Sequence, residues 1–467
     1  MLQIEAASLR HWVGRGPRSA SRFLRSAEGG IALGDLDGRT SLGGRLHELA
    51  GRAVLLVAHD QLAAGLALIE LDGIARRIVL CPPDLPAEHI GAVTRDAEID
   101  AVVADRPTGE HALLGIGLEV QAGTRLDPDE EPPPARRRTE WVLLTSGTTG
   151  APKLVSHDVA SLIAPIKPTA EPPVWGTFYD IRRYGGLQIL LRALVGGGSM
   201  ILSSAGEGVA DHLRRLAAGG VTHLSGTPSH WRAALMSGAA QAIAVRQVRL
   251  SGEIADQTIL DKLRAAYPHA QIGHAFASTE AGVGFEVTDG LVGFPENLVG
   301  GDGDVDIRVA TGSLRLRSAR TAYAYLGRGA PALLDGEGFV DTGDIVELRG
   351  GRYYFVGRRE GIINVGGRKV HPEEVEAAIN RHPDVHASLV RPRRNPITGA
   401  IVVADVVLKD ATSRRAEEAD ARLAELEREI VTLCRLCLAP YKVPAAIRFV
   451  AGLDVAPTGK LTRQAGR

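Results

Sequence analysis

Three features that mark particular classes of protein are scarce or missing in this sequence. Only 3 cysteines occur among the 467 residues, at positions 81, 434 and 437, too few for the disulfide framework of a small secreted scaffold. No apolar run is as long as a membrane span, and the start of the chain, Met1–Ala6, lacks the basic and apolar segments of a secretory leader. We therefore expect a cytoplasmic protein that does not insert into a membrane.

An excess of one charge is missing as well. The chain has 54 Lys and Arg against 55 Asp and Glu, a formal net charge of -1 at pH 7, so nothing indicates nucleic acid as a partner. With 45% hydrophobic and 23% charged residues the composition is that of a globular protein. Because 467 residues exceed what one hydrophobic core usually holds, we expect two or more domains.

Cysteines and histidines at the spacing of a metal or redox site are also scarce. The pair Cys434-x-x-Cys437 could belong to a redox or metal site, but apolar residues around it recur at helical spacing, so we interpret it as part of a packed helix. The apolar series is Leu423, Leu426, Ile430, Leu433 and Cys437. Four histidines in the middle of the chain also lack the spacing of metal ligands. They are His212, His223, His230 and His274.

Short apolar runs alternate with helix-like stretches in the first part of the chain. Residues 53–57, 61–71 and 78–80 follow this pattern, which predicts a parallel α/β layer. Residues 127–138 are rich in proline and change from acidic to basic, so we interpret them as a linker. A second α/β layer is expected from strands at 199–202, 222–225 and 247–251 and a helix at 257–266.

The pattern changes again after residue 300. Short, glycine-punctuated, strand-like segments continue to residue 355 and predict a small β unit. From residue 360 a separate α+β module is expected, with a helix at 372–380, a strand at 401–408 and a long helix at 414–438. The predicted fold is therefore α/β: a large N-terminal domain, residues 1–358, of stacked α/β layers with a small β unit, and a smaller α+β C-terminal domain, residues 360–467.

The strongest chemical signal is the segment Thr-Ser-Gly-Thr-Thr-Gly-Ala-Pro-Lys at residues 145–153. It follows an apolar, strand-like run at 141–144, the usual position of a phosphate-binding loop. Glycines let backbone N–H groups approach phosphate oxygens, hydroxyls add donors, and the lysine adds a positive charge. The spacing departs from the Walker form, which argues against an ordinary phosphate-loop hydrolase. Taken alone, such a cluster is also typical of a surface turn.

Four more segments follow this loop in a fixed order. They read Phe-Ala-Ser-Thr-Glu at 276–280, Phe-Val-Asp-Thr-Gly-Asp at 339–344, Gly-Arg-Arg-Glu-Gly-Ile-Ile-Asn-Val-Gly-Gly-Arg-Lys-Val at 357–370, and Pro-Thr-Gly-Lys-Leu-Thr-Arg at 457–463. With these five segments the chain resembles the adenylate-forming superfamily of acyl-CoA synthetases, peptide-synthetase adenylation domains and luciferases. It looks most like an AMP-forming acyl-CoA synthetase.

The resemblance implies a role for each matched residue. The residues implied in ATP binding are Thr145, Ser146, Gly147, Thr148, Thr149, Gly150, Lys153, Gly252, Glu253, Phe276, Ala277, Ser278, Asp344 and Arg358. Thr279 is expected at the α-phosphate and Glu280 at Mg²⁺, a hard cation that suits carboxylate oxygen. Lys460 is the expected catalytic lysine, because a mobile ammonium can bridge the substrate carboxylate and the α-phosphate.

The C-terminal domain is expected to move. In the family it rotates about a hinge, here at about residues 359–361 with Glu360 in the hinge position, and brings a new strand to the site for thioester formation. The resemblance places Gly366, Gly367 and Lys369 at the coenzyme A site.

Four positions depart from the family pattern. Glu360 stands where aspartate or lysine is usual, and Lys369 replaces an arginine, which keeps the charge but loses the bidentate fork. Phe276 replaces a tyrosine and keeps only its aromatic face, while Ala277 replaces a glycine and is expected to tighten the pocket.

The acyl pocket is expected around residues 177–187, where the family often has a histidine and this chain has none. Tyr179, Asp180 and Arg183 are candidate substrate-binding residues, and Trp231 is a candidate for the pocket floor. An ion-paired loop and a packed core tryptophan are equally good interpretations. A charged, aromatic stretch is costly beside an alkyl chain, so we expect aromatic or polar acids rather than long unbranched fatty acids.

The expected function is that of an ATP-dependent acid–thiol ligase, which forms an acyl-AMP with release of pyrophosphate and transfers the acyl group to coenzyme A. Its expected cofactors and substrates are ATP, Mg²⁺, coenzyme A and a carboxylic acid. Two alternatives share the same motifs: a stand-alone adenylation enzyme that loads a carrier protein, and a non-catalytic nucleotide-binding homologue.

Overall fold

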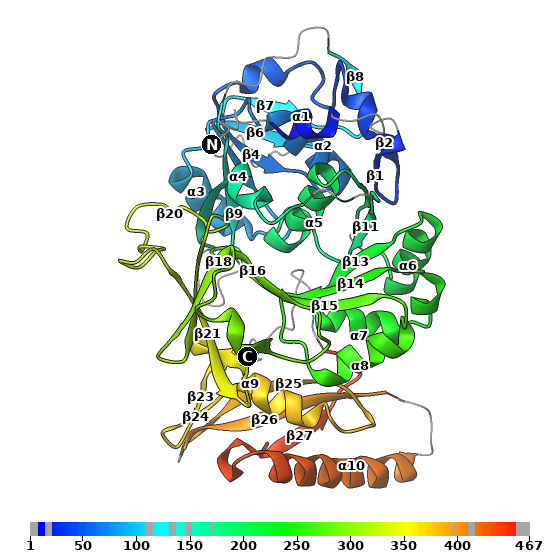
Figure 1. Cartoon of the computed structure of the whole chain (residues 1–467), viewed down its shortest axis with the longest axis vertical. Helices are drawn as coiled ribbons and strands as arrows, with labels where there is room; N and C mark the ends of the chain where they lie inside the picture. Colours follow the sequence, from blue (N-terminus) through cyan, green and yellow to red (C-terminus); the bar gives the residue numbers. More distant parts are fainter. Residues whose placement is uncertain are drawn as a thin grey trace.

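The computed structural model describes residues 8–14, 21–107, 115–129, 137–145, 152–167, 169, 171–204, 206–396, 398–409 and 416–453. These residues form stacked tiers that follow the order of the chain (Figure 1). Two tiers are mainly parallel sheets with helices, a third is an antiparallel β unit, and the last is an α+β layer. The predicted fold class is confirmed. The predicted domain boundary at residues 358–360 stays a prediction.

The first tier is a seven-stranded sheet in the order β20-β10-β9-β5-β4-β6-β7. Its strands are β4 (Ala53–Val57), β5 (Arg77–Leu80), β6 (Ala101–Ala104), β7 (Glu119–Gln121), β9 (Glu140–Leu144), β10 (Leu154–Asp158) and β20 (Ala324–Leu326). The strands from β9 to β7 are parallel, whereas β10 and β20 join the edge in antiparallel pairing. The central parallel strands β4, β5 and β6 are mainly apolar and buried, because their faces are covered, whereas the edge strand β7 is mostly exposed. The helices of this region are α1 (Leu9–Gly14), α2 (Gln61–Leu71), α3 (Ala87–Asp96) and α4 (Val159–Ile163).

The second tier is an eight-stranded sheet in the order β16-β15-β14-β13-β11-β12-β1-β2. Its strands are β1 (Phe23–Arg25), β2 (Gly30–Ala32), β11 (Val174–Thr177), β12 (Ser199–Ile201), β13 (His223–Gly226), β14 (Gln247–Ser251), β15 (Gln271–Ser278) and β16 (Gly282–Val287). Helices α5 (Tyr184–Val195), α6 (Val209–Ala218), α7 (Pro228–Met236) and α8 (Gln257–Ala266) connect them. The hairpin β1–β2 comes from the start of the chain and pairs with β12 at the far edge.

The largest core lies where the first two tiers meet. Helix α2 is mostly apolar and is buried at every position, including Gln61 and Glu70, as expected for a helix enclosed on all sides. It packs with α5 and with residues of β4 and β12 in one hydrophobic cluster. Both helices therefore fix how the two sheets are stacked.

The predicted β unit is a five-stranded antiparallel sheet in the order β17-β22-β21-β19-β18. Its strands are β17 (Phe294–Pro295), β18 (Val305–Ala310), β19 (Ser313–Ser318), β21 (Val340–Arg349) and β22 (Arg352–Arg358). The intervening strand β20 leaves this unit and completes the first tier. Residues 301–358 thus tie the β unit to the sheet that carries the phosphate loop.

The last tier contains β23 (Ile363–Val365), β24 (Arg368–Val370), β25 (Val385–Asn395), β26 (Gly399–Leu408) and β27 (Ala446–Phe449), with α9 (Pro372–Ile379) and α10 (Ala416–Cys437). The order β24-β23-β26-β25, with β27 beside β26, forms one sheet. Helix α10 lies along its outer side (Figure 1).

Smaller elements complete the described residues. The short strands β3 (Arg39–Thr40) and β8 (Asp127–Pro128) pair with each other, so the proline-rich segment begins in a strand pair. Short 3-10 helices occur at Leu33–Leu36, Leu46–Leu49, Ala240–Ala242, Glu296–Leu298, Arg359–Gly361 and Pro440–Lys442.

The cysteine interpretation needs one correction. Among the described side chains of α10 the buried ones are Leu426, Ile430 and Cys434, spaced by four, whereas Cys437 is exposed. The predicted stripe therefore assigned the wrong cysteine to the core, because it followed spacings of three and four through Leu433. Burial raises the pKa of the Cys434 thiol to about 11.

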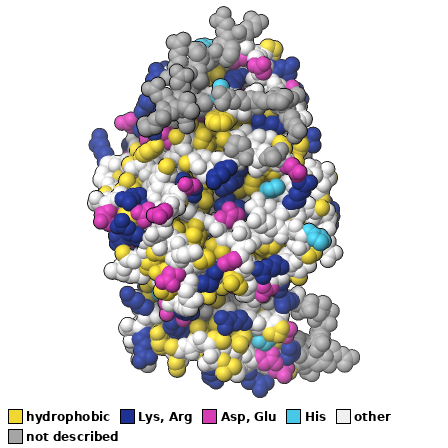
Figure 2. All heavy atoms as spheres, viewed as in Figure 1, with side chains coloured by type: hydrophobic (Ala, Val, Ile, Leu, Met, Phe, Trp, Pro, Cys, Tyr) yellow, Lys and Arg dark blue, Asp and Glu magenta, His cyan; other side chains and the backbone are white. Residues whose placement is uncertain are grey.

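Over the described ranges, no helix has the length and apolar character that crossing a membrane requires. Basic and acidic side chains are interspersed on the face shown in Figure 2.

Candidate active site

The predicted phosphate loop lies in sequence between β9 and β10, which pair with each other. Thr145 N donates a hydrogen bond to Lys153 O at 3.0 Å, and Leu144 pairs with Leu154. The two described ends of the loop are therefore held together as the ends of a hairpin. Ser146, Gly147, Thr148, Thr149 and Gly150 lie outside the described residues.

Lys153, Tyr325 and Glu280 meet beside this hairpin. Lys153 Nζ lies 5.0 Å from the centroid of the Tyr325 ring, and the Tyr325 hydroxyl donates to Glu280 Oε1 at 3.2 Å. The structure therefore brings the predicted phosphate lysine and the predicted magnesium carboxylate to the same side chain. Burial, followed by the charge of Glu280, raises the pKa of Tyr325, so its hydroxyl stays protonated and able to donate.

The segment Thr279–Glu280 is held by backbone contacts as well. His157 on β10 has its Nε2 2.7 Å from Thr279 O, and Ala322 N donates to Glu280 O at 2.9 Å. Burial lowers the pKa of His157 to about 4, so the ring is neutral at pH 7 and Nε2–H is the donor to this carbonyl. Strands β10 and β20 thus fix the expected α-phosphate and magnesium residues relative to the phosphate loop.

The sequence motifs did not predict that His157 and Tyr325 belong to the site. His157 contacts a carbonyl 122 positions away, and Tyr325 depends on the pairing of β20 with β10. Both contacts join segments that are far apart in the chain, so no pattern within one segment indicates them.

Tyr325→Phe is expected to raise the magnesium concentration needed for half-maximal adenylation and to lower the rate at limiting magnesium about tenfold, the order of one hydrogen bond to a charged group. The phenyl ring keeps its contact with Lys153 and loses only the donor to Glu280. Pyrophosphate release measured across a magnesium titration tests this. Tyr323→Phe is the matched control, because its hydroxyl accepts from Arg138 Nη2 at 2.6 Å instead. Equal effects in both variants would contradict a specific role for Tyr325.

His157→Gln is expected to make the free energy of unfolding less dependent on pH between about pH 6.5 and pH 4. The neutral His157 ring contributes stability in full above its unfolded pKa of about 6.5, and this contribution is lost as the pH falls from there towards about 4. In that window the unfolded state binds the extra proton, so stability falls by at most about 1.4 kcal/mol per pH unit. Urea unfolding at pH 7.5 and pH 5.0 measures the difference between wild type and variant. The exposed His47, changed to Gln, should leave the profile unchanged.

Phe276, one of the residues implied in ATP binding, belongs to an aromatic cluster between the second sheet and the β unit. Phe276 stacks on Phe285 and Phe355, with ring centroids 5.7 and 5.4 Å away. The register of β15 against β16 shifts between Phe276 and Ala277, a bulge that re-aims the residues after it. Ser278 Oγ accepts from Ala281 N at 2.9 Å, which fixes the turn that carries Thr279 and Glu280.

Gly252 and Glu253 follow β14. Gly252 has a φ of +88°, a left-handed conformation that favours glycine. Glu253 Oε2 accepts from Ser229 N at 2.9 Å, at the start of α7. The two predicted ATP-binding residues therefore lie where β14 ends and α7 begins.

Asp344 and Arg358, two of the residues implied in ATP binding, lie side by side. They are directly opposite on β21 and β22, and Arg358 Nε is 3.5 Å from Asp344 Oδ1. Arg358 Nη2 also donates to Thr342 O at 3.0 Å. The Arg358 side chain is 57% exposed and that of Asp344 is 19% exposed, so both remain accessible to a ligand.

The expected hinge and coenzyme A residues lie at the start of the last tier. Glu360 is in the short helix Arg359–Gly361. Gly366 and Gly367 form a two-residue turn between β23 and β24 with φ of +56° and +79°, a hairpin turn that glycine favours at both positions. Lys369 is exposed on β24. Lys460 lies outside the described residues, so its catalytic role stays a prediction.

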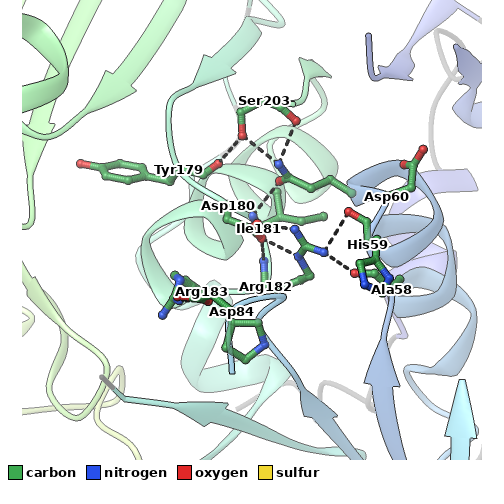
Figure 3. Close-up of polar contacts among 12 residues, drawn as sticks. Ala58, His59, Asp60, Asp84, Tyr179, Asp180, Ile181, Arg182, Arg183 and Ser203 are labelled. Atoms are coloured by element: carbon green, nitrogen blue, oxygen red, sulfur yellow. Dashed lines mark hydrogen bonds and ion pairs between the residues drawn. The ribbon is translucent and has the colours of Figure 1, made fainter. Parts of the chain in front are cut away.

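The candidate acyl-pocket residues are engaged in ion pairs (Figure 3). Asp180 accepts from Arg182 Nε at 2.7 Å, and Arg182, almost fully buried, also donates to the carbonyls of Ala58 and His59 at the end of β4. Arg183 pairs with Asp84. These contacts match the interpretation of an ion-paired loop, which links the two tiers. A role for Asp180 and Arg183 in substrate binding stays a prediction.

Tyr179 points away from these ion pairs (Figure 3). Its hydroxyl donates to Ser251 O at 2.7 Å, next to Gly252. Trp231 has no exposed surface and packs edge-on against Phe178 and Tyr267. Trp231 is therefore a core residue of the second tier, and its place in an acyl pocket stays a prediction.

The surroundings of Glu280 fit a magnesium ion. One carboxylate oxygen accepts from Tyr325, and among the described residues no hydrogen bond reaches the other oxygen. The described residues contain no group of three or more His, Cys, Asp or Glu that could hold a metal. Mg²⁺ commonly binds through one or two carboxylates together with substrate phosphates, and a carboxylate oxygen that no described residue engages, beside the predicted phosphate loop, meets that requirement.

Known proteins with the same organisation are numerous. The chain is similar to the 2-succinylbenzoate–CoA ligase of Salmonella typhimurium, with 28% identity over 389 residues that cover 81% of this chain and 80% of the ligase. It is 25% identical over 462 residues to a dimodular nonribosomal peptide synthase of Bacillus subtilis, of which it spans 18%. The ATP-bound structure of MatB from Rhodopseudomonas palustris superposes with a TM-score of 0.79 at 20% identity, covering 98% of this chain and 97% of MatB. An anthranilate CoA ligase with bound anthranoyl-AMP gives a TM-score of 0.78 at 18% identity, covering 97% and 95%.

Two family descriptions match the sequence itself. Residues 58–303 match "AMP-binding enzyme" and residues 374–460 match "AMP-binding enzyme C-terminal domain". Together they contain the strands, turns and loops that carry most of the predicted site residues. The chain belongs to the family of AMP-binding, adenylate-forming enzymes.

Proposed function

We propose that this protein is an AMP-forming acid–CoA ligase. It activates a carboxylic acid with ATP as an acyl-AMP, releases pyrophosphate, and transfers the acyl group to coenzyme A. The observation that carries the proposal is the convergence of Lys153, Tyr325 and Glu280 beside Thr279. This places a cation, an oriented carboxylate and the expected α-phosphate residue on one edge of the first sheet.

Different residues of the site have different roles in the formation of the acyl-adenylate. A carboxylate attacking the α-phosphate brings two anions together, so the site must supply positive charge and fixed geometry. The phosphate loop and Lys153 hold the terminal phosphates, Asp344 accepts from the ribose hydroxyls, and Arg358 reaches the ribose or the phosphates. His157 and Tyr325 keep Thr279 and Glu280 in place. When bound at Glu280, magnesium supplies further positive charge.

The choice of coenzyme A rests on the Salmonella relative, whose name specifies CoA. The Bacillus peptide synthase supports a carrier protein as the alternative thiol. Enzyme, ATP and a candidate acid, mixed with either coenzyme A or a phosphopantetheinylated carrier protein, separate the two. Accumulation of acyl-CoA supports the proposal. Pyrophosphate release with acylation of the carrier protein alone would make the protein a stand-alone adenylation enzyme, and no release with any acid would overturn both.

Asp180 is proposed to influence which acids are accepted. Asp180→Ala is expected to change the ranking of substrates more than the binding of ATP, because it releases Arg182 from its partner beside the expected acyl pocket. Pyrophosphate release across aromatic, short, medium and amino carboxylic acids gives the ranking, and calorimetry gives the ATP affinity. Asp84→Ala, which frees Arg183 instead, is the comparison. An unchanged ranking, or a wild-type preference for palmitate over benzoate-like acids, would return the stretch to a structural role.

A further inference from the structure

A half-buried aromatic pair lies over the carboxyl end of β13 in the second tier. Phe178 and His230 stack with their ring centroids 5.2 Å apart and an angle of 13° between the ring planes. Gly226, the last residue of β13, makes room for them, because an added Cβ would lie 2.7 Å from Phe178 Cδ2 and 3.2 Å from His230 Cβ. Both residues of the pair remain partly exposed, at the end of a parallel sheet where ligands commonly bind.

The cap of helix α7 determines which ring nitrogen of His230 carries the hydrogen. Thr227 and His230 form a capping box, in which Thr227 N donates to His230 Nδ1 at 3.1 Å. A backbone N–H can only donate, so Nδ1 offers its lone pair and the neutral ring carries its hydrogen on Nε2. Burial, followed by the charge of His212, lowers the pKa of His230 to about 4, so the ring is neutral at pH 7 and Nε2–H is a donor.

This donor has no acceptor among the described residues. The hydrogen bonds that join the His230 ring to described residues all involve Nδ1, which also lies 3.1 Å from Thr227 Oγ1. The second histidine beside the pair, His212, differs, because its Nδ1 lies 3.0 Å from Glu207 Oε2 and its Nε2 lies 3.1 Å from Thr177 O. An N–H donor that is taken out of water without an acceptor is costly, and a ligand that supplies the acceptor removes this cost.

Two contacts connect His230 to the expected site. Its ring lies edge-on to Tyr179, a candidate acyl-pocket residue, with the ring centroids 5.8 Å apart. The preceding residue, Ser229, donates its backbone N–H at 2.9 Å to Oε2 of Glu253, which is implied in ATP binding. His230 therefore lies next to residues expected at the acyl group and at the nucleotide.

We propose that His230 is a specificity-determining residue that donates its Nε2 hydrogen to an oxygen acceptor on the acyl group. The enzyme then selects acids with an ether, carbonyl or hydroxyl oxygen over their hydrocarbon counterparts. The inference rests on the proposed function and narrows its substrate class. The stacked Phe178 ring and the capping box hold the imidazole in one orientation. An acid with a methylene group at the position of the oxygen leaves the donor unpaired.

Pairs of acids that exchange one oxygen for a methylene group test this directly. Wild-type enzyme is assayed for pyrophosphate release with the ortho, meta and para methoxybenzoates against the matching ethylbenzoates, and with γ-methoxybutyrate against hexanoate. We expect kcat/KM to favour the oxygen-containing acid of at least one pair about 10-fold, the size of one hydrogen bond. His230→Phe keeps a ring against Phe178 and should remove this preference by raising KM for the oxygen-containing acid. His230→Gln keeps an acceptor for Thr227 N and an N–H donor, and it should retain part of the preference.

A spectroscopic readout on the wild type does not depend on how well a variant folds. NMR of nitrogen-labelled histidine identifies the tautomer of His230, whose signals are assigned by their loss in His230→Gln. We expect the hydrogen on Nε2, and we expect the Nε2 signal to shift when the preferred acid binds in the presence of ATP. A hydrogen on Nδ1, or an Nε2 signal that does not move, overturns the inference.

Further controls separate this inference from the proposed function. His223→Gln changes a histidine at the opposite end of β13, where it packs against Trp175, and it should leave the preference unchanged. Equal kcat/KM within every pair of acids, or a preference that survives His230→Phe, overturns the inference and leaves the ligase proposal standing. A wild-type enzyme that releases no pyrophosphate with any acid overturns the proposed function.

Discussion

Lys460→Ala is expected to abolish acyl-adenylate formation and to spare the transfer of an acyl group from supplied acyl-AMP to coenzyme A. The physical reason is that charge builds between the acid carboxylate and the α-phosphate only in the first half-reaction. Loss of a group that stabilises this charge costs about 100-fold or more in rate. Because the resemblance implies that the C-terminal domain carries Lys460 away before thioester formation, the second half-reaction does not need it.

Two separate assays measure this effect. Pyrophosphate release reports the first half-reaction, and acyl-CoA formed from synthetic acyl-AMP reports the second. Lys409→Ala is a suitable control, since it removes an exposed lysine of the same domain at the end of β26. Equal losses in both half-reactions would show that Lys460 is structural or that the domain does not rotate.

Glu280→Gln is expected to lower adenylation about 100-fold at low magnesium and to recover part of the rate as magnesium rises. The amide keeps an oxygen that accepts from Tyr325, so the hydrogen bond of 3.2 Å can persist while the negative charge is lost. Hard divalent cations prefer charged carboxylate oxygen to a neutral amide. The loss is therefore assigned to metal affinity rather than to folding.

Calorimetric titration of ATP with and without magnesium gives a readout that does not depend on turnover. In wild type, magnesium should strengthen ATP binding, and in the variant that gain should shrink. Glu286→Gln removes a carboxylate of the same sheet that contacts Arg249 instead, and it should leave the magnesium effect intact. If Glu280→Gln changes neither ATP–magnesium binding nor turnover, Glu280 is not the metal carboxylate.

The sequence predicted well those elements whose periodicity is local. Strands β4, β12 and β14 and helix α8 appear within a few residues of the predicted positions, because apolar runs and helical spacing report which segments are buried. Asp344 and Arg358, which come from two separate sequence motifs, lie opposite each other on paired strands.

These local patterns could not predict which distant strands pair with each other. Nothing in a window of sequence reveals that β20 leaves the β unit to join β10, and so Tyr325 and His157 were missed. Asp180 shows a different difficulty, since both of its interpretations fitted the sequence; the contact with Arg182 matches an ion-paired loop, and a role in substrate binding stays a prediction.

The hairpin β1–β2 has a consequence for shortened versions of the protein. It covers β12, through the pairing of Leu24 with Met200, and Arg22 just before it donates to the carbonyls of Ala193 and Leu194 at the end of α5. A truncation that begins after residue 32 leaves the unpaired N–H and C=O groups of β12 as a bare edge, which invites pairing with another chain. A version of the protein that begins at residue 33 should therefore aggregate, and the hairpin supplied as a separate peptide should restore a monodisperse protein.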